Sequence, residues 1–341
     1  MTDRQGDIKQ IFNDLLDDSG SPGQRVRKRI DQGSPINLYA ARTFPYKNVL
    51  LEIGPIKKAY LPDGFTRPQI KGLNITVDTT QKAGGGDITL LLELQQTEAM
   101  DVFGTFVTRV CEEMDSLPKP ADAVRAVIAL VERWKEFFAG NSELLSEGRQ
   151  TGLYGELHLM ARLYAAGVPI NQLVKAWTGS KRTNQDYEFG EVSIEVKSTT
   201  AVDATTVNIT NIRQLDETGL ELLFLNRILM DVRRGTERTL PVLVETLRAT
   251  ITKQAPEVAL DFEEKILSAK YCNGHAEHYA NRSYTERALE FYEVREGFPR
   301  LLESGLPTGV TKAAYEITLE HCKSFERSSE KVFAFMRKYC D

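Results

Sequence analysis

Several features are scarce in this sequence, and each absence excludes a class of protein. No run of about 18 apolar residues occurs, so no membrane-spanning helix is predicted. The first seven residues lack the apolar stretch of a signal peptide. The cysteines are far apart in sequence and form no CxxC pair, which is typical of reduced thiols; they are Cys111, Cys272, Cys322 and Cys340. We therefore expect a cytoplasmic protein with no membrane partner.

Basic charge is not in excess either. Lys and Arg number 43 against 48 Asp and Glu, which gives a net charge of −5. A nucleic acid would therefore bind at a local patch and not through the bulk charge of the protein. One such patch is the basic cluster at 25–29, although a solvated helix face is the preferred interpretation of that cluster.

Motifs of other enzyme classes are also missing. No Gly-x-Ser-x-Gly occurs, and four histidines do not suggest a Ser-His-Asp hydrolase. The glycine-rich stretch at 82–87 lacks the Gly-Lys-Ser/Thr ending of an ATP-binding loop, so it is interpreted as a hairpin loop. Cys272, His275 and His278 have ligand-like spacing, but no fourth zinc ligand is adjacent, so no zinc site is predicted.

The length of 341 residues favours two domains. We predict an N-terminal α+β domain at 1–140 and an α/β domain at 141–341. For the first, we expect a helix followed by a polar connection within 1–33, then strands and two helices. The strands are at 36–41, 48–54, 72–78 and 87–95, and the helices at 98–115 and 120–138.

The second domain begins with a helix whose apolar face runs from Leu153 to Tyr164, followed by a polar loop. Strands are predicted at 186–189, 192–198, 205–209, 220–232, 288–295 and 312–319. Helices are predicted at 239–254, 258–270 and 323–339.

The most informative feature is an acid, Asp186, followed after a short turn by Glu195 and Lys197 in an apolar strand. Residues two apart leave the same face of a strand, so Glu195 and Lys197 share one face. Two opposite charges with a second carboxylate nearby predict a divalent-metal site with a cation beside it. That arrangement suits phosphodiester hydrolysis. The alternative is a salt bridge on the surface of an exposed strand.

The order of elements and five segments together resemble the PD-(D/E)XK nuclease superfamily, the fold of many restriction endonucleases. Within it, residues 151–232 resemble a branch encoded in bacterial restriction and phage-defence gene clusters. The segments are GLYGEL at 152–157, AWTG at 176–179, QDYEFG at 185–190, IEVKST at 194–199 and IRQLD at 212–216. The sequence departs from the superfamily pattern at Gln185, which stands where the pattern has Pro. The resemblance implies a mixed sheet flanked by helices.

The resemblance also implies roles for individual residues. Asp186 and Glu195 are expected to bind Mg²⁺ or Mn²⁺, with the Val196 carbonyl as a backbone ligand. Lys197 is expected to orient the attacking water and to stabilise developing negative charge. Glu156, on the preceding helix, is a further expected ligand, with a solvated helix residue as the alternative. Gly152 and Gly155 would let this helix approach the sheet.

Basic and polar residues around this site are candidates for contacts with DNA. Lys175, Lys181, Arg182 and Arg213 are expected to contact phosphates. Gln214 or Asp216 is expected to hold a water or a phosphate, with an ordinary polar turn as an equal alternative. Trp177 is interpreted as a core residue.

The function that these features imply is Mg²⁺-dependent cleavage of double-stranded DNA, as in type II restriction endonucleases, within a restriction or anti-phage defence system. A homodimer is expected, because cutting both strands commonly needs two sites. Methyltransferase, ATPase or helicase subunits encoded nearby are expected partners. The alternatives are a non-catalytic DNA-binding or scaffold subunit and a nuclease acting on RNA.

Overall fold

The computed structural model describes residues 4–31, 33–62, 64–70, 72–79, 87–95, 99–140, 144–179, 184–202, 204–310 and 312–340. The chain forms two compact units. Unit 1 comprises residues 1–144 together with 270–275, and unit 2 comprises 145–269 together with 276–341. The short segment 270–275 thus returns to the first unit from within the second half of the sequence. None of the helices in the described parts has the length and hydrophobicity needed to span a bilayer.

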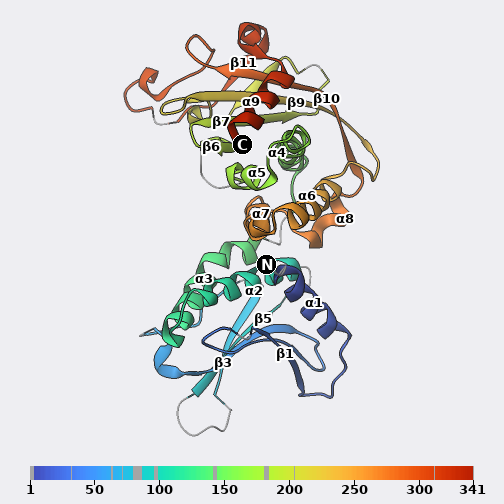
Figure 1. Ribbon diagram of the computed structural model, residues 1–341, viewed down its shortest axis with the longest axis vertical. Helices are drawn as coiled ribbons and strands as arrows, with labels where there is room; N and C mark the ends of the chain where they lie inside the picture. Colours follow the sequence, from blue (N-terminus) through green and yellow to red (C-terminus); the bar gives the residue numbers. More distant parts are fainter. Residues whose placement is uncertain are drawn as a thin grey trace. The chain divides into compact units, whose positions relative to one another are not determined.

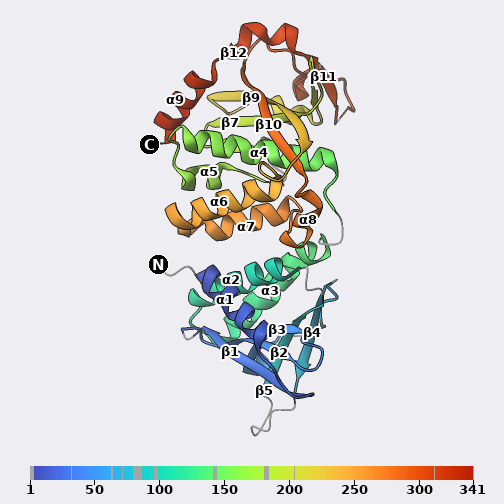
Figure 2. The ribbon, with the colours of Figure 1, turned by 90° about the vertical axis from the view of Figure 1, so that its right-hand side faces the viewer.

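Unit 1 is an antiparallel sheet covered on one side by helices (Figures 1 and 2). The strands lie in the order β1-β2-β3-β5-β4, and aromatic pairs such as Phe12–Phe103 and Phe106–Trp134 join the helices. The strands are β1 (Arg25–Asp31), β2 (Leu38–Thr43), β3 (Val49–Lys57), β4 (Leu73–Asp78) and β5 (Asp87–Leu94). The helices are α1 (Arg4–Asp17), α2 (Met100–Asp115), α3 (Pro120–Gly140) and the 3-10 turns η1 (Lys58–Tyr60) and η5 (Asn273–His275).

The basic cluster at 25–29 forms the edge strand β1, so the expected helix face was wrong. Its arginines alternate with Val26, Lys28 and Ile30, a period of two that suits a strand. Arg25 Nη1 lies 3.1 Å from Glu52 Oε2, and Arg27 pairs with the other oxygen of the same carboxylate. Glu52 is fully buried, and burial of an unpaired carboxylate is costly. These two arginines therefore neutralise an internal charge.

Unit 2 is built on a mixed sheet with the strand order β12-β10-β9-β7-β6, in which only β7 and β9 are parallel. Its strands are β6 (Tyr187–Phe189), β7 (Val192–Thr199), β9 (Leu222–Arg234), β10 (Arg282–Val294) and β12 (Glu326–Arg327). A separate pair, β8 (Thr206–Ile209) with β11 (Tyr315–Thr318), lies over one face of this sheet. Helices α4 (Glu147–Ala165) and α5 (Ile170–Ala176) lie on the other (Figures 1 and 2). Apolar residues of both strand layers, including Leu225, Ile209 and Ile317, form one core cluster.

The helices of unit 2 are α4 (Glu147–Ala165), α5 (Ile170–Ala176), α6 (Leu240–Gln254), α7 (Ala259–Ser268), α8 (Ala276–Tyr279) and α9 (Ser329–Cys340). Short 3-10 turns are η3 (Ile212–Leu215), η4 (Pro256–Val258), η6 (Glu303–Gly305) and η7 (Leu319–Phe325). The mixed sheet flanked by helices confirms the predicted fold class. Helix α5 was missed, because the segment was taken as part of a polar loop.

The close approach of α4 to the sheet depends on one glycine. A Cβ atom at Gly155 would lie 2.6 Å from the side chain of Ser198 on β7, closer than real atoms pack. A Cβ atom at Gly152 would meet nothing within 4 Å, so Gly152 is not required for this contact. The neighbouring Glu156 then lies beside β6, where the Tyr187 hydroxyl donates to its backbone carbonyl.

Candidate metal-dependent nuclease site

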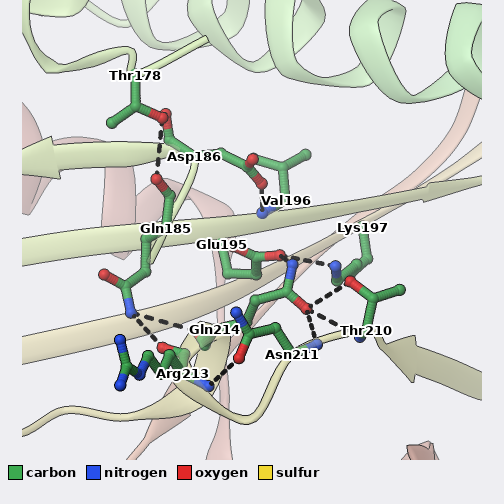
Figure 3. A network of polar contacts seen from close by, with 10 residues as sticks. All are labelled: Thr178, Gln185, Asp186, Glu195, Val196, Lys197, Thr210, Asn211, Arg213 and Gln214. Atoms are coloured by element: carbon green, nitrogen blue, oxygen red, sulfur yellow. Dashed lines mark hydrogen bonds and ion pairs between the residues drawn. The ribbon is translucent and has the colours of Figure 1, made fainter. Parts of the chain in front are cut away.

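The site forms around the β6–β7 hairpin. Gly190 turns the chain between the strands with φ +68°, a conformation that favours glycine. Asp186 stands immediately before β6, and its Oδ2 accepts the backbone N–H of Val196 on β7 at 2.7 Å. A backbone donor at the end of a strand pair needs a partner, so this contact holds the Asp186 carboxylate beside β7. Figure 3 shows this contact together with the network below the hairpin.

The backbone of Asp186 is anchored as well. The N–H of Thr178 donates to the Asp186 carbonyl at 2.9 Å. The Thr178 hydroxyl donates to the carbonyls of Gln185 at 3.0 Å and Asp186 at 3.2 Å. The sequence prediction gave Thr178 no role, although it lies in the AWTG segment that supported the resemblance.

Glu195 and Lys197 lie on one face of β7, as expected. The strand is internal, between β6 and β9, and the Glu195 side chain is only 1% exposed. Lys197 Nζ lies 2.7 Å from Glu195 Oε1. The pair is therefore not an ion pair on an exposed strand, and that alternative is wrong. A buried carboxylate normally requires such a partner.

Glu156 approaches from α4. Its Oε2 accepts the indole N–H of Trp177 at 2.8 Å, and its backbone carbonyl accepts the Tyr187 hydroxyl at 2.8 Å. Trp177 is fully buried, which agrees with its expected place in the core. The hydrogen bond from Trp177 therefore fixes the Glu156 side chain near the hairpin, so Glu156 is not a freely solvated helix residue.

Electrostatics couple these acids. Burial raises the pKa of Glu156 well above 4.5, and the charge of Asp186 raises it further. Burial and then Asp186 likewise raise the pKa of Glu195 well above 4.5, while Lys197 opposes the shift. Burial also raises the pKa of Asp186, against the opposing Val196 N–H, Lys197 and a side-chain hydrogen bond with Glu195. The site therefore concentrates carboxyl groups whose negative charges are poorly solvated.

Gln214 joins this cluster from η3. Its Nε2 donates to Glu195 Oε1 at 2.7 Å, so it contacts an acid of the site. Asp216 instead accepts from the backbone and hydroxyl of Thr218, at 3.0 and 2.6 Å, as in an ordinary polar turn. Gln185, at the position of the superfamily proline, donates through Nε2 to the Arg213 carbonyl at 2.9 Å and so ties η3 to the hairpin.

Two of the residues expected to contact phosphates, Lys175 and Arg213, lie outside this cluster. Lys175 is exposed on α5. Arg213 is exposed and pairs through Nε with Glu303 at 2.7 Å. Lys181 and Arg182 lie outside the described residues.

The residues at the hairpin suit a hard cation. Mg²⁺ is commonly held by one or two carboxylates with waters completing its shell, and the neighbouring residues Asp186 and Glu195 supply two carboxyl groups. Within the described parts of the chain, no group of three or more His, Cys, Asp or Glu side chains could hold a metal ion together. That finding applies to Cys272, His275 and His278, and equally to Glu156, Asp186 and Glu195, which do not form such a group of three.

A comparison with protein families gives one match. The family model described as "Putative PD-(D/E)XK family member, (DUF4420)" matches residues 8–320, most of the chain and both structural units. Neither the curated proteins nor the solved structures contain a match to this chain. The chain has the mixed sheet of this fold, and Asp186 is followed by Glu195 and Lys197 as in the family's pattern. The match over residues 8–320 shows that the chain belongs to this family of PD-(D/E)XK-type proteins.

Proposed function

We propose that this protein is a Mg²⁺- or Mn²⁺-dependent endonuclease that hydrolyses phosphodiester bonds of double-stranded DNA. The observation that carries the proposal is that two desolvated carboxyl groups, those of Asp186 and Glu195, lie with the Lys197 ammonium at the β6–β7 hairpin. Proteins of the PD-(D/E)XK superfamily are generally nucleases, and this chain keeps the acid and the Glu-x-Lys of that pattern.

Each residue of the site has a separate role in this proposal. Asp186 and Glu195 would hold the cation, with the Val196 carbonyl and Glu156 as further ligands. A bound cation would polarise the scissile phosphate and the attacking water. The Lys197 ammonium, 2.7 Å from Glu195, is close enough to the ligands to orient the water and to neutralise charge that develops on the phosphate.

Contacts with the duplex would come from the surface near the hairpin. Lys175 is exposed on α5, and Arg213 is exposed on η3, where a phosphate would have to compete with its ion-pair partner Glu303. Phosphate contacts of this kind position a duplex without reading its sequence. Lys181 and Arg182 are proposed to add to them. Gln214 approaches from the same side as Arg213.

We place this activity in a bacterial restriction or anti-phage defence system, with methyltransferase, ATPase or helicase subunits encoded nearby as partners. Two copies of the chain would supply the two active sites that cutting both strands commonly needs. Unit 1 would recognise DNA, bind a partner or form the dimer.

The test is cleavage of plasmid DNA with Mg²⁺ or Mn²⁺ by the wild type, Asp186→Ala and Lys197→Ala, with Lys323→Ala as the control. Lys323 is an exposed lysine in η7. We expect cutting by the wild type and the control, and a loss of at least about a hundred-fold in both site variants.

The other outcomes each reject part of the proposal. Equal cutting by wild type and site variants would remove Asp186 and Lys197 from the mechanism. No cutting by the wild type, alone or with its genomic partners, would favour a non-catalytic DNA-binding or scaffold subunit. Cutting of RNA but not of plasmid would change the substrate.

A further inference from the structure

The amide of Gln214 is held in one orientation. Its Oε1 accepts three donors of the preceding turn, namely the Thr210 N–H at 3.0 Å, the Thr210 hydroxyl at 3.1 Å and the Asn211 N–H at 3.2 Å. With Asn211, whose Oδ1 accepts the Arg213 N–H, it completes a capping box at the start of η3. Since these donors require an oxygen, the other end of the amide must be the NH₂ group.

That NH₂ group meets Glu195. Gln214 Nε2 donates to Glu195 Oε1 at 2.7 Å, and the same oxygen lies 2.7 Å from Lys197 Nζ (Figure 3). Two strong donors on Oε1 leave Oε2 as the oxygen with which Glu195 can bind a cation. Gln214 is uncharged, so it holds the carboxylate without reducing the negative charge that attracts the cation.

The turn that carries Gln214 is itself anchored at two points. Gln185 Nε2 donates to the Arg213 carbonyl at 2.9 Å, and Arg300 Nη1 donates to the Leu215 carbonyl at 2.9 Å. Ile212 and Leu215 are buried beneath it. The Gln214 backbone is therefore fixed relative to β7, and the side chain can transmit that position to Glu195.

We propose that Gln214 is a positioning residue that makes Glu195 present a single oxygen, Oε2, to the divalent cation, and that it thereby sets cation affinity. This inference rests on the proposed function, because it needs a cation at Asp186 and Glu195. It replaces the direct phosphate or water contact expected for Gln214. Partners that orient metal ligands typically change metal affinity by about 10–100-fold when they are removed.

The experiment compares Gln214→Met with Asn211→Ala by Mn²⁺ titration calorimetry. Each variant breaks one half of the same capping box, but only Gln214→Met removes the donor to Glu195. We expect about ten-fold weaker Mn²⁺ binding in Gln214→Met and a change within about two-fold in Asn211→Ala. The midpoint of thermal unfolding without metal should fall in both variants, and further in Gln214→Met, because Gln214 accepts three donors of the turn and Asn211 accepts one.

Binding to duplex DNA without divalent metal separates positioning from phosphate contact. The affinity should stay within about two-fold in Gln214→Met if the residue acts through Glu195. Equal loss of Mn²⁺ affinity in both variants would reduce Gln214 to a structural role and overturn the inference. Wild-type Mn²⁺ affinity in Gln214→Met would overturn it as well.

The outcome for the proposed function is separate. A wild type that binds Mn²⁺ but cuts no nucleic acid would reject the nuclease activity and leave the calorimetric comparison decisive for Gln214. A wild type that binds no Mn²⁺ would reject both.

Discussion

At the scale of single residues, the site places acids where water cannot solvate them well. Glu195 is 1% exposed, and Glu156 lies against the buried Trp177. The donors that partly offset this loss of solvation are the Lys197 ammonium, an indole N–H, a backbone N–H and a side-chain amide. Such a cluster costs stability while it lacks a cation, and a divalent ion that binds it would return that stability.

The first prediction concerns Glu156→Gln. The amide oxygen can still accept the Trp177 N–H, so the packing is kept while a buried group that must either carry a charge or take up a proton is replaced by a neutral one. We expect the metal-free midpoint of thermal unfolding at pH 7 to rise by about 2–4 °C, and Mn²⁺ affinity to fall. Scanning calorimetry and Mn²⁺ titration measure the two effects. A lowered midpoint would show that the buried Glu156 carboxyl group does not destabilise the metal-free folded state.

The second prediction is the pH dependence of this difference. The folded pKa of Glu156 lies above its ordinary value of 4.5, so its protonated form favours the folded state. The corresponding stability is fully present below about pH 4.5 and is lost as pH rises through the folded pKa. The gain in unfolding midpoint of Glu156→Gln should therefore be smallest near pH 4 and grow toward pH 7. A gain that shrinks with rising pH would contradict the direction of the shift.

The shared strand face of two proposed catalytic residues was the most predictable part of the site. The two-residue spacing of Glu195 and Lys197 determines that they share a strand face, and the structure confirms it. The contacts that hold Asp186 and Glu156 were not predictable. Val196 and Trp177 act through backbone or ring N–H groups, and Thr178 acts through its N–H and hydroxyl, and none of these donors carries a sequence pattern. The roles of Asp186, Glu195 and Glu156 as metal ligands stay predictions.

At the scale of elements, α4 and the β6–β7 hairpin determine where the acids meet. Gly155 lets the helix come close to β7, where Ser198 also donates its hydroxyl to the Thr151 carbonyl at 2.9 Å. A displacement of this helix would move Glu156 away from the hairpin.

The third prediction compares Gly155→Ala with Gly152→Ala. A methyl group at 155 meets Ser198 at 2.6 Å, so we expect about 1–3 kcal/mol of destabilisation. A methyl group at 152 meets nothing within 4 Å, so the better helix propensity of Ala should stabilise by about 0.5–1 kcal/mol. Urea unfolding measures both changes. Adding Ser198→Gly should recover part of the loss at 155, and strictly additive effects would contradict the contact.

Strong periodic patterns predicted most elements, and local ambiguity explains the misses. The helices α2, α3, α6 and α7 and the strands β3, β5, β7 and β9 lie close to their predicted ranges. The segment at 25–29 was assigned to a helix face from its positive charge alone. The alternation of arginines with other residues, which has the period of a strand, was not used. Helix α5 has seven residues, too few for a clear helical period.

At the scale of the whole molecule, the net charge of −5 opposes general attraction to nucleic acid. The arginines of β1 do not change this balance, because Arg25 and Arg27 pair with Glu52. Binding of a duplex would then depend on a few phosphate contacts near the site, and its salt dependence would be correspondingly modest.

The fourth prediction concerns Lys175→Ala. If this exposed lysine contacts one phosphate, the variant should bind all duplex sequences more weakly by a similar factor. The slope of log affinity against log salt concentration should fall in magnitude by about 0.9. Fluorescence anisotropy across a salt series measures this slope, and an unchanged slope would place Lys175 outside the interface.

The most direct test of the central claim is anomalous X-ray diffraction from crystals of the whole protein soaked in Mn²⁺. The account predicts an anomalous peak bonded to carboxylate oxygens of both Asp186 and Glu195, and its loss in Asp186→Ala. A Mn²⁺ ion bound elsewhere, with no peak between these two carboxylates at a concentration that supports cleavage, would contradict it.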